Sequence, residues 1–513
     1  MLLSSLCVVS MEQVQFNYSL KNIPIPSNQE YLLELISSVE VFVANLRWRA
    51  FNFLQPNNKN KVKETFGFKS TNPAPSVAEL KEFENDLSEL VANIQFKAHK
   101  PNDLQRKMKK DIMDMKNEKK LFVQADKTNN FYKLETEKYE ELLHNNITKE
   151  YKKVQSNIVD KVNDGDREIA EKLEIDDRVY SMQKRPAYIT LKDHKENFQN
   201  NPKCRLINPS KTELGKISKH HLSKIVTIVR KESNLSQWKN TPSVITWFTE
   251  LENKERLSFI QFDIADYYPS ISQSLLSKSL NYARKYVNIS EEEKEIIFQA
   301  RKSILFKDQS AWVQKDNSLF DVTMGSWDGA EICELVGLYL LSQLSKLGIK
   351  IGLYRDDGLS VCQLNPRQTE LMKKKICKIF QDNDLKITIE AIEANKKNVN
   401  FLDVNFDLTT GIYKPYMKPN DQPRYVHQKS NHPPSILKNI PKSVNKRLSS
   451  ISANEEVFKA AIPPFQESLH QSGYNFELKY TQCEPSQEKR RQRTRPVTPH
   501  GQKMSRQIWG ANF

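Results

Sequence analysis

Three aspartates of this chain have the surroundings needed to act together: Asp263 ends the apolar run LSFIQFD, and Asp356 and Asp357 lie within GLYRDDGL. The apolar runs predict buried strands whose ends aim the carboxylates at one edge of a sheet. Burying several like charges together is costly unless cations neutralise them, and Mg²⁺ is a natural choice because it prefers oxygen ligands. Two such ions about 4 Å apart would activate a 3′-hydroxyl and stabilise a leaving pyrophosphate, which is nucleotidyl transfer.

An ordinary hairpin is the alternative for the second pair of acids. Asp-Gly is a common turn dipeptide, and Asp357-Gly358 is flanked by apolar residues on both sides. Taken alone, this hairpin would favour a plain turn, and Asp263 would be an ordinary strand-end acid. The combination of a strand-end acid, an aromatic pair (Tyr267-Tyr268) and a Tyr-x-Asp-Asp hairpin, in that order, instead favours a polymerase-type palm.

The elements around these acids can be predicted from local patterns. A helix follows Pro269 with an apolar face, Ser290 and Glu293 form a capping box, and Asn365-Pro366 begins a further helix. Between them, a long helix runs from Asp328 to Gly348 and is followed by a hairpin, and two strand segments close the region. In chain order the hairpin spans 349–364 and the strand segments span 386–391 and 400–408. This order predicts an α+β fold, with a sheet that has helices packed on one face.

Composition excludes several classes of protein. The chain has 513 residues, 38% of them hydrophobic, with 78 Lys and Arg against 63 Asp and Glu, so 78 − 63 gives a net charge of +15. These values exclude collagen-like, low-complexity and mostly disordered chains and indicate polyanionic partners. The six cysteines show no C-x-x-C spacing, which fits a reducing compartment. The apolar run at residues 2–9 is too short for a membrane span and lacks a basic flank, so we expect neither a signal peptide nor an anchor.

The motifs resemble those of reverse transcriptases. FDIADYYPSI (262–271) is similar to motif A, MGSWDGAE (324–331) to motif B, and YRDD (354–357) to motif C. Together with ITLKDHK, NPKCRLINP and NFLDVNFDL, they resemble the polymerases of Penelope-like retroelements over about Phe122 to Tyr474. The resemblance implies a right-hand fold with a ferredoxin-like palm. It divides the chain into a basic helical N-terminal extension (1–120), fingers (121–255), palm (256–410), thumb (411–482) and a disordered basic tail (483–513).

The resemblance also assigns roles to individual residues. Asp263, Asp356 and Asp357 match the catalytic and metal-binding acids, with Asp263 and Asp356 as the closest ligands. The remaining positions match nucleotide-binding residues. These are Tyr268 as steric gate against a ribose 2′-OH, Arg205 and Lys192 at the triphosphate, Asp266 orienting the triphosphate, and Gly325 admitting a template base or sugar. Their alternatives are a core aromatic for Tyr268, solvated strand-end cations for Arg205 and Lys192, a solvent-facing acid for Asp266 and a plain turn glycine for Gly325. Lys396 or Lys397 falls near a lysine thought to protonate pyrophosphate.

The implied activity is RNA-directed DNA synthesis with two Mg²⁺ ions, Mn²⁺ being the alternative. The implied partners are an RNA template, a DNA primer and dNTPs, without a membrane, in the nucleus or cytoplasm. A catalytically inactive nucleic-acid-binding remnant is the competing hypothesis, and an RNA-dependent RNA polymerase ranks third. Many Penelope-like elements carry a GIY-YIG endonuclease. Here Gly411-Ile412-Tyr413 has no YIG after it, so we expect a fortuitous hairpin turn and no DNA cleavage. For the basic tail at 483–513 three alternatives stay open: a nuclear-localisation signal, a segment that clamps nucleic acid, or a chain end without a function.

Overall fold

A computed structural model describes part of the chain. The described residues are 4–5, 31–54, 73–94, 103, 106, 107, 110, 113, 114, 117 and 120–482, without 127–129, 156, 177–178, 180–181, 183, 194, 196, 317, 391–395, 418–422 and 429–431. The basic tail at 483–513 lies outside them, as does most of the N-terminal apolar run. No helix in the described ranges is long and apolar enough to cross a membrane.

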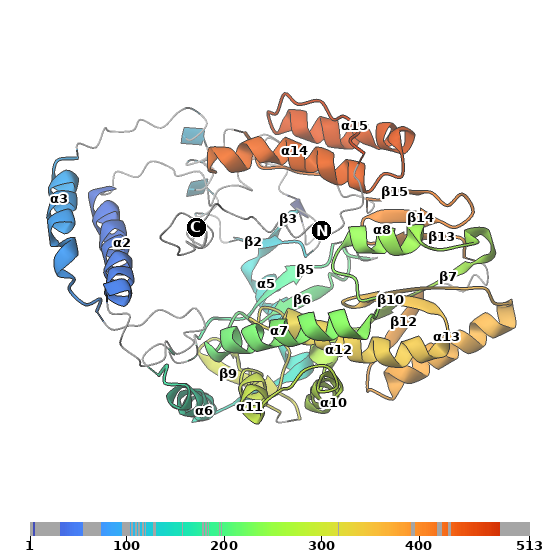
Figure 1. Ribbon diagram of the computed structural model, residues 1–513, viewed down its shortest axis with the longest axis horizontal. Helices are drawn as coiled ribbons and strands as arrows, with labels where there is room; N and C mark the ends of the chain where they lie inside the picture. Colours follow the sequence, from blue (N-terminus) through green and yellow to red (C-terminus); the bar gives the residue numbers. More distant parts are fainter. Residues whose placement is uncertain are drawn as a thin grey trace.

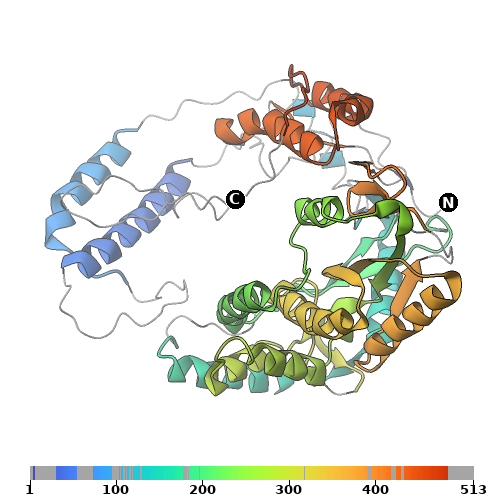
Figure 2. The same ribbon diagram turned by 45° about the vertical axis from the view of Figure 1, so that its right-hand side comes forward.

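The segment predicted as an N-terminal extension contains two helices. Helix α2 (Tyr31–Leu54) packs beside α3 (Lys81–Ala92), which follows the 3₁₀ turn η2 (Ala78–Leu80). Arg47 of α2 donates from Nε to Glu84 of α3 at 2.6 Å. Both views show this pair apart from the rest of the chain (Figures 1 and 2). The short strand β1 (Ser4–Ser5) instead pairs with β3, so the first residues of the chain contact the segment predicted as fingers.

The segment between 120 and 256 mixes short strands and helices, some of which pack on the palm. In order, the elements are β2 (Lys120–Gln124), β3 (Phe131–Glu135), α5 (Thr136–Glu150), β4 (Tyr151–Val154), α6 (Asn157–Lys172), β5 (Tyr188–Leu191), β6 (Cys204–Ile207), α7 (Leu214–Ser233), α8 (Thr241–Thr249) and the 3₁₀ turn η3 (Lys254–Arg256). The sequence runs ITLK and CRLI form an antiparallel pair, β5 with β6, in which Thr190 lies opposite Arg205.

The central sheet confirms the ferredoxin-like palm. Four antiparallel strands lie in the order β10-β11-β7-β12, and the chain visits them as βαββαβ. Their bounds are β7 Ser258–Ile264, β10 Lys350–Tyr354, β11 Asp357–Cys362 and β12 Ile387–Glu390. The intervening elements are α9 (Tyr267–Ser270), α10 (Gln273–Ala283), α11 (Glu291–Gln299), β8 (Leu305–Lys307), β9 (Ser310–Gln314), α12 (Gly329–Leu344), η4 (Ser345–Leu347) and α13 (Pro366–Gln381). The predicted α+β class is therefore correct.

Local signals set the helix ends where the sequence predicts them. Ser290 and Glu293 exchange both capping-box hydrogen bonds at the start of α11, and Asn365 does the same with Gln368 at the start of α13. Gly348 ends the α12–η4 segment with a φ of 70°, a left-handed conformation that favours glycine. These ends depend on neighbours within a few residues, so sequence alone is enough to find them.

The sheet is covered on both faces, which corrects the prediction of helices on one face. Phe262 and Ile264 of β7 pack on one side, against helices α7, α10, α12 and α13. Phe259 of β7 and Leu359 of β11 pack on the other side, against α8 and strands β13 (Asn398–Phe401) and β14 (Val404–Asp407). The alternating side chains of β7 are apolar on both faces, so one strand serves two cores.

The C-terminal helices form a separate small core. Helices α14 (Pro434–Ser450) and α15 (Glu455–Gln471) lie side by side (Figure 1) and bury Leu448, Phe458 and Leu469. We expected prolines to break these helices, but Pro463-Pro464 lies inside α15 and Pro441 inside α14. The strand before them, β15 (Tyr413–Pro415), pairs with β14, and Gly411 forms the turn with a φ of 70°, so the GIY string is a hairpin turn as expected.

Candidate active site

The three aspartates meet at one end of the palm sheet. Asp263 of β7 and Asp357 of β11 are register partners across the antiparallel pair, which places their Cα atoms about 4.5–5.5 Å apart. Side chains of directly opposite residues lie on the same face of a sheet. Asp356 is next to them, because its carbonyl accepts the N–H of Ile264 at 3.0 Å. The prediction that folding brings these acids to one edge is therefore correct at the level of the backbone.

The turn of the Tyr-x-Asp-Asp hairpin lies two residues earlier than an Asp-Gly turn would. Tyr354 pairs with Asp357, so Arg355 and Asp356 form the turn, and Arg355 has a φ of 54°. Asp357 and Gly358 both belong to β11. Gly358 lies against the ring of Phe262, and a Cβ at this position would overlap that ring. The glycine is required by packing on β7 rather than by the turn.

Tyr267 and Tyr268 follow Asp263 and have different surroundings. Tyr267 is the core aromatic: it is buried and donates its hydroxyl to the carbonyl of Cys333 at 2.9 Å. Tyr268 is partly buried, and its ring lies 3.4 Å from the position of a Cβ on Gly329 at the start of α12. Burial is the main cause that raises the pKa of the Tyr268 phenol, and the nearby Asp356 raises it further. Tyr268 thus lies near Asp356 and also near the beginning of α12.

The two predicted phosphate-binding cations lie together. Arg205 on β6 donates from Nη1 to Asp126 Oδ1 at 2.8 Å, and the Asp126 side chain is only 5% exposed. Burial lowers the pKa of Lys192, the charge of Arg205 lowers it further, and Asp266 and Asp126 act in the opposite direction. Lys192 therefore lies close enough to Arg205 and Asp266 for their charges to interact. Asp266 is exposed, as its pattern predicts, and it precedes α9 with a φ of 45°.

The backbone at Gly325 packs closely against the backbone of Asn208. It has a φ of 112°, and a Cβ would come within 2.7 Å of the carbonyl oxygen of Asn208, just after β6. Because a side chain here would clash with that carbonyl, the fold itself requires glycine at this position. This favours the turn-glycine alternative over direct contact with a template base. The close approach also joins the loop before α12 to the strand that carries Arg205.

The hydrogen bonds of the two candidate lysines after β12 are not to the acids. The Lys397 amino group donates to the carbonyls of Glu255 and Leu257 at 2.9 and 2.5 Å. The Lys396 amino group donates to Gln261 Oε1 at 3.3 Å. Both anchor the start and middle of β7, whereas Asp263 lies near its end. Their contacts indicate a structural role.

Two acid–base pairs were missed by sequence reasoning. One is Asp126 with Arg205, for which an acid directly after the apolar run LFV was the available signal. The other is the fully buried pair of Arg301 and Asp328, in which Asp328 also accepts a hydrogen bond from Ser218 at 2.5 Å. Asp328 was expected only to open α12. Its carboxylate makes no capping bond there, because it is bound by Arg301 and Ser218.

Comparisons with known proteins complete the description of the site. A family model described as "Animal helix-turn-helix domain" matches residues 424–478, which include α14 and α15. No curated protein sequence matches the chain.

Solved polymerase structures match over most of the chain. Telomerase from Candida albicans in complex with a fragment of telomeric RNA is 12% identical with a TM-score of 0.46, over 73% of this chain and 68% of that one. Apo telomerase from Candida tropicalis, truncated at its C-terminal domain, is 13% identical with a TM-score of 0.43, over 78% and 95%. The RNA-dependent RNA polymerase of a human picobirnavirus is 10% identical with a TM-score of 0.39, over 78% and 84%. These likenesses concern the fold alone, a mixed helix-and-strand architecture of the right-hand polymerase type.

Proposed function

We propose that this chain is a nucleic-acid polymerase, and specifically an RNA-directed DNA polymerase that adds dNTPs to a primer 3′-hydroxyl. The observation that carries the proposal is the register of β7 and β11, which sets Asp263 opposite Asp357 with Asp356 in the adjoining turn. A hairpin that only reverses the direction of the chain does not require three carboxylates at one end of a sheet. They suit a reaction in which anionic oxygens must be held close together.

The acids fit divalent cations by their chemistry. Mg²⁺ is usually held by one or two carboxylates together with substrate phosphates and water, and Asp263 and Asp357 supply such a pair. Among the described residues no group of three His, Cys, Asp or Glu side chains is placed to hold a metal ion by itself. When bound, Mg²⁺ would lower the pKa of the attacking hydroxyl and balance charge on the leaving pyrophosphate. Asp263, Asp356 and Asp357 are the residues that would hold it.

The remaining residues act on the nucleotide in this proposal. Arg205 and Lys192 neutralise the triphosphate, and the guanidinium of Arg205 can bind two phosphate oxygens at once. Asp126 keeps that guanidinium oriented through its 2.8 Å ion pair. Tyr268 presents its ring beside the acids, where a ribose 2′-hydroxyl would collide with it. The chemistry of each side chain supports its role, and for Tyr268 the nearby charge of Asp356 does so as well.

A retroelement of the Penelope-like group is the source we propose. The motif resemblance supports it, together with the intact Tyr-x-Asp-Asp hairpin and an RNA-bound telomerase among the structures of similar fold. The expected partners are an RNA template and a DNA primer.

Primer extension tests the proposal. The full chain is incubated with poly(rA)/oligo(dT), Mg²⁺ and either dTTP or UTP, beside an Asp356→Asn variant of equal thermal stability. We expect dTTP incorporation by the wild type and none by the variant. Salt-sensitive RNA binding without extension would indicate the inactive remnant, and preference for UTP would indicate an RNA polymerase. Incorporation that is equal in the wild type and the variant would refute the assignment of the acids.

A further inference from the structure

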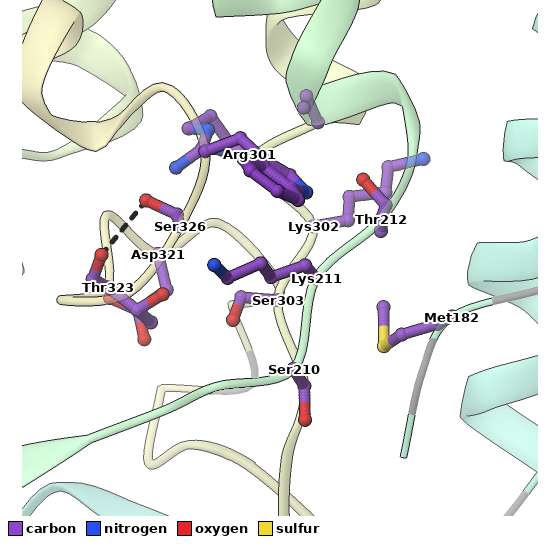
Figure 3. Close-up of a pocket in the computed structure, with 13 residues that line it drawn as sticks. Met182, Ser210, Lys211, Thr212, Arg301, Lys302, Ser303, Asp321, Thr323 and Ser326 are labelled. Carbon is purple, nitrogen blue, oxygen red and sulfur yellow. Dashed lines mark hydrogen bonds between the residues drawn. The ribbon is translucent and has the colours of Figure 1, made fainter. Parts of the chain in front are cut away.

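A second site lies on the far side of the loop that precedes α12. A small pocket of about 20 Å³, open to solvent on one side, lies between the start of α7, the end of α11 and this loop. Figure 3 shows basic and hydroxyl side chains around it. The lining residues used below are Lys211, Thr212, Arg301, Lys302, Asp321 and Trp327. None of them belongs to the proposed catalytic and nucleotide-binding residues, and only Arg301, the buried partner of Asp328, has been described above.

The pocket is cationic. Lys211 and Lys302 line it, and neither has an ion pair with a described residue. Burial lowers the pKa of Lys211, and the surrounding cations Arg185, Lys219 and Lys216 lower it further. Lys216 and Lys219 have acidic partners, Glu213 at 2.6 Å and Glu331 at 3.5 Å, so the excess charge is concentrated on the two lining lysines. Crowding of cations in a part-buried place favours an anionic ligand.

Buried donors in the pocket wall lack acceptors. The hydroxyl of Thr212, a residue that is 6% exposed, has no hydrogen-bond partner among the described residues, and neither does Nε of Arg301, which is 2% exposed. Thr212 lies two residues before α7, a helix of 20 residues whose N-terminal N–H groups attract negative charge. Unsatisfied buried donors are uncommon in folded proteins and call for an explanation. A ligand oxygen in the pocket would provide it.

Two acids oppose this charge without cancelling it. Asp321 also lines the pocket: its Oδ2 accepts a hydrogen bond from the Tyr151 hydroxyl at 2.6 Å, its Oδ1 has no partner among the described residues, and burial raises its pKa to about 6. The buried Asp166 interacts with Lys302, and burial raises its pKa to about 7. The charge of Arg301 is balanced by Asp328, so Lys211, Lys302 and the neighbouring Arg185 outnumber these two acids.

An aromatic side chain borders the cations. Trp327 is 36% exposed, and the amino groups of Lys211 and Lys216 lie 4.3 and 5.1 Å from the centre of its ring. Exposed rings beside lysines are typical of sites for single-stranded nucleic acid, which combine phosphate contacts with base stacking. Tyr268 lies near Gly329, two residues beyond Trp327, so this loop separates the pocket from the acids.

We propose that this pocket binds one phosphate group of a single-stranded nucleic-acid segment, with Lys211, Lys302 and the start of α7 at the phosphate and Trp327 against a neighbouring base. The inference rests on the proposed function, because it assigns a place to the strand that a polymerase must hold. It adds a subsite that the acid cluster does not require.

The test measures binding apart from synthesis. Fluorescein-labelled rU₁₂ is titrated with the full chain carrying Asp356→Asn, in EDTA and without nucleotides, from 50 to 300 mM NaCl, and anisotropy is recorded. The pocket variant is Lys211→Ala/Lys302→Ala. Its matched control is Lys278→Ala/Lys294→Ala, which removes the same charge from a groove on α10 and α11. Loss of one phosphate contact lowers the slope of log K against log salt by about 0.7, equivalent to about fivefold weaker binding at 0.1 M salt.

Further variants separate the phosphate site from a general charge effect. Thr212→Val removes the hydroxyl with little change of shape and should weaken binding, whereas Lys302→Arg should retain it. Equal slopes and affinities in the pocket variant and its control would overturn the proposal. Competition with inorganic tripolyphosphate distinguishes the source of the phosphate: displacement of rU₁₂ from the wild-type pocket at equimolar competitor would overturn the nucleic-acid assignment. If binding of rU₁₂ depends on the pocket but the wild-type chain never extends a primer, the polymerase function is refuted and the assignment of the pocket still holds.

Discussion

Asp263 and Asp357 lie directly opposite one another on the antiparallel strands β7 and β11. Like charges in this arrangement repel, and cross-strand pairs contribute about 0.2–1 kcal/mol to stability in either direction. The chain therefore keeps two mutually repelling carboxylates at the end of its central sheet. A pair of this kind costs stability when no cation is present and becomes favourable when a cation is shared.

We expect Asp263→Asn to stabilise the protein in EDTA by about 0.2–1 kcal/mol, because it removes this repulsion. Thermal unfolding with and without Mg²⁺ measures the effect. The wild type should gain stability from Mg²⁺ and the variant should not. An equal gain in both would show that Asp263 does not bind the ion. Asp384→Asn, which changes a surface acid beyond α13, is a suitable control for net charge.

Tyr268→Ala should relax sugar selection, because removal of the ring opens the space beside Asp356 that a 2′-hydroxyl would occupy. The measurement is the ratio of kcat/KM for dTTP and UTP on the same primer. We expect this ratio to fall at least tenfold, with Tyr268→Phe close to the wild type. An unchanged ratio in the alanine variant would assign Tyr268 to packing alone.

Asp126→Asn should weaken nucleotide binding by acting through Arg205. Hydrogen bonds to charged groups contribute about 1.5–3 kcal/mol, so release of the guanidinium should raise KM for dTTP about tenfold while kcat changes less. Steady-state kinetics separate these two quantities. Asp160→Asn, on the exposed face of α6, serves as the control. A drop in kcat at constant KM would contradict the positioning role.

Gly358→Ala should destabilise the palm, because its Cβ would overlap the ring of Phe262 on the adjacent strand. Overpacking of a core typically costs about 1–3 kcal/mol. Denaturant unfolding measures this cost. Gly358→Ala combined with Phe262→Leu should recover part of the stability, since the smaller side chain makes room. Wild-type stability for the single variant would show that the sheet adjusts freely.

Asp166→Asn should stabilise the protein only at higher pH. Burial raises the pKa of Asp166 to about 7, above the value of 3.8 expected when the chain is unfolded. The folded state therefore binds this proton more tightly, and the contribution of Asp166 to stability is lost as pH rises from about 4 to about 7. The asparagine still accepts from Gln299, which is 2.8 Å from Asp166. Thermal unfolding should show higher stability for the variant at pH 8 and equal stability at pH 4. A constant difference at both pH values would contradict the titration.

Local patterns were sufficient for much of the candidate site. The strand ending at Asp263, the capping boxes at Ser290 and Asn365 and the hairpin of the Tyr-x-Asp-Asp motif all depend on residues within a few positions of one another. The prediction that the acids meet also succeeded, because apolar runs identify buried strands and the motif order limits how they pair. The Asp-Gly dipeptide suggests a turn two residues too late, because Gly358 is needed for packing on Phe262 and no local rule shows that contact.

The sequence by itself determined which side chains we propose for the chemistry and where most of the palm helices and strands lie, since both depend on residue type and short-range spacing. Only the tertiary structure decided that β7 packs on two faces, that Asp126 holds Arg205, that Gly325 rests on Asn208 and that Lys211 and Lys302 share a pocket. These relationships join residues far apart in the chain. The pairing of a charge or the closeness of two backbones depends on how whole elements pack, and that packing has no signature in a short stretch of sequence.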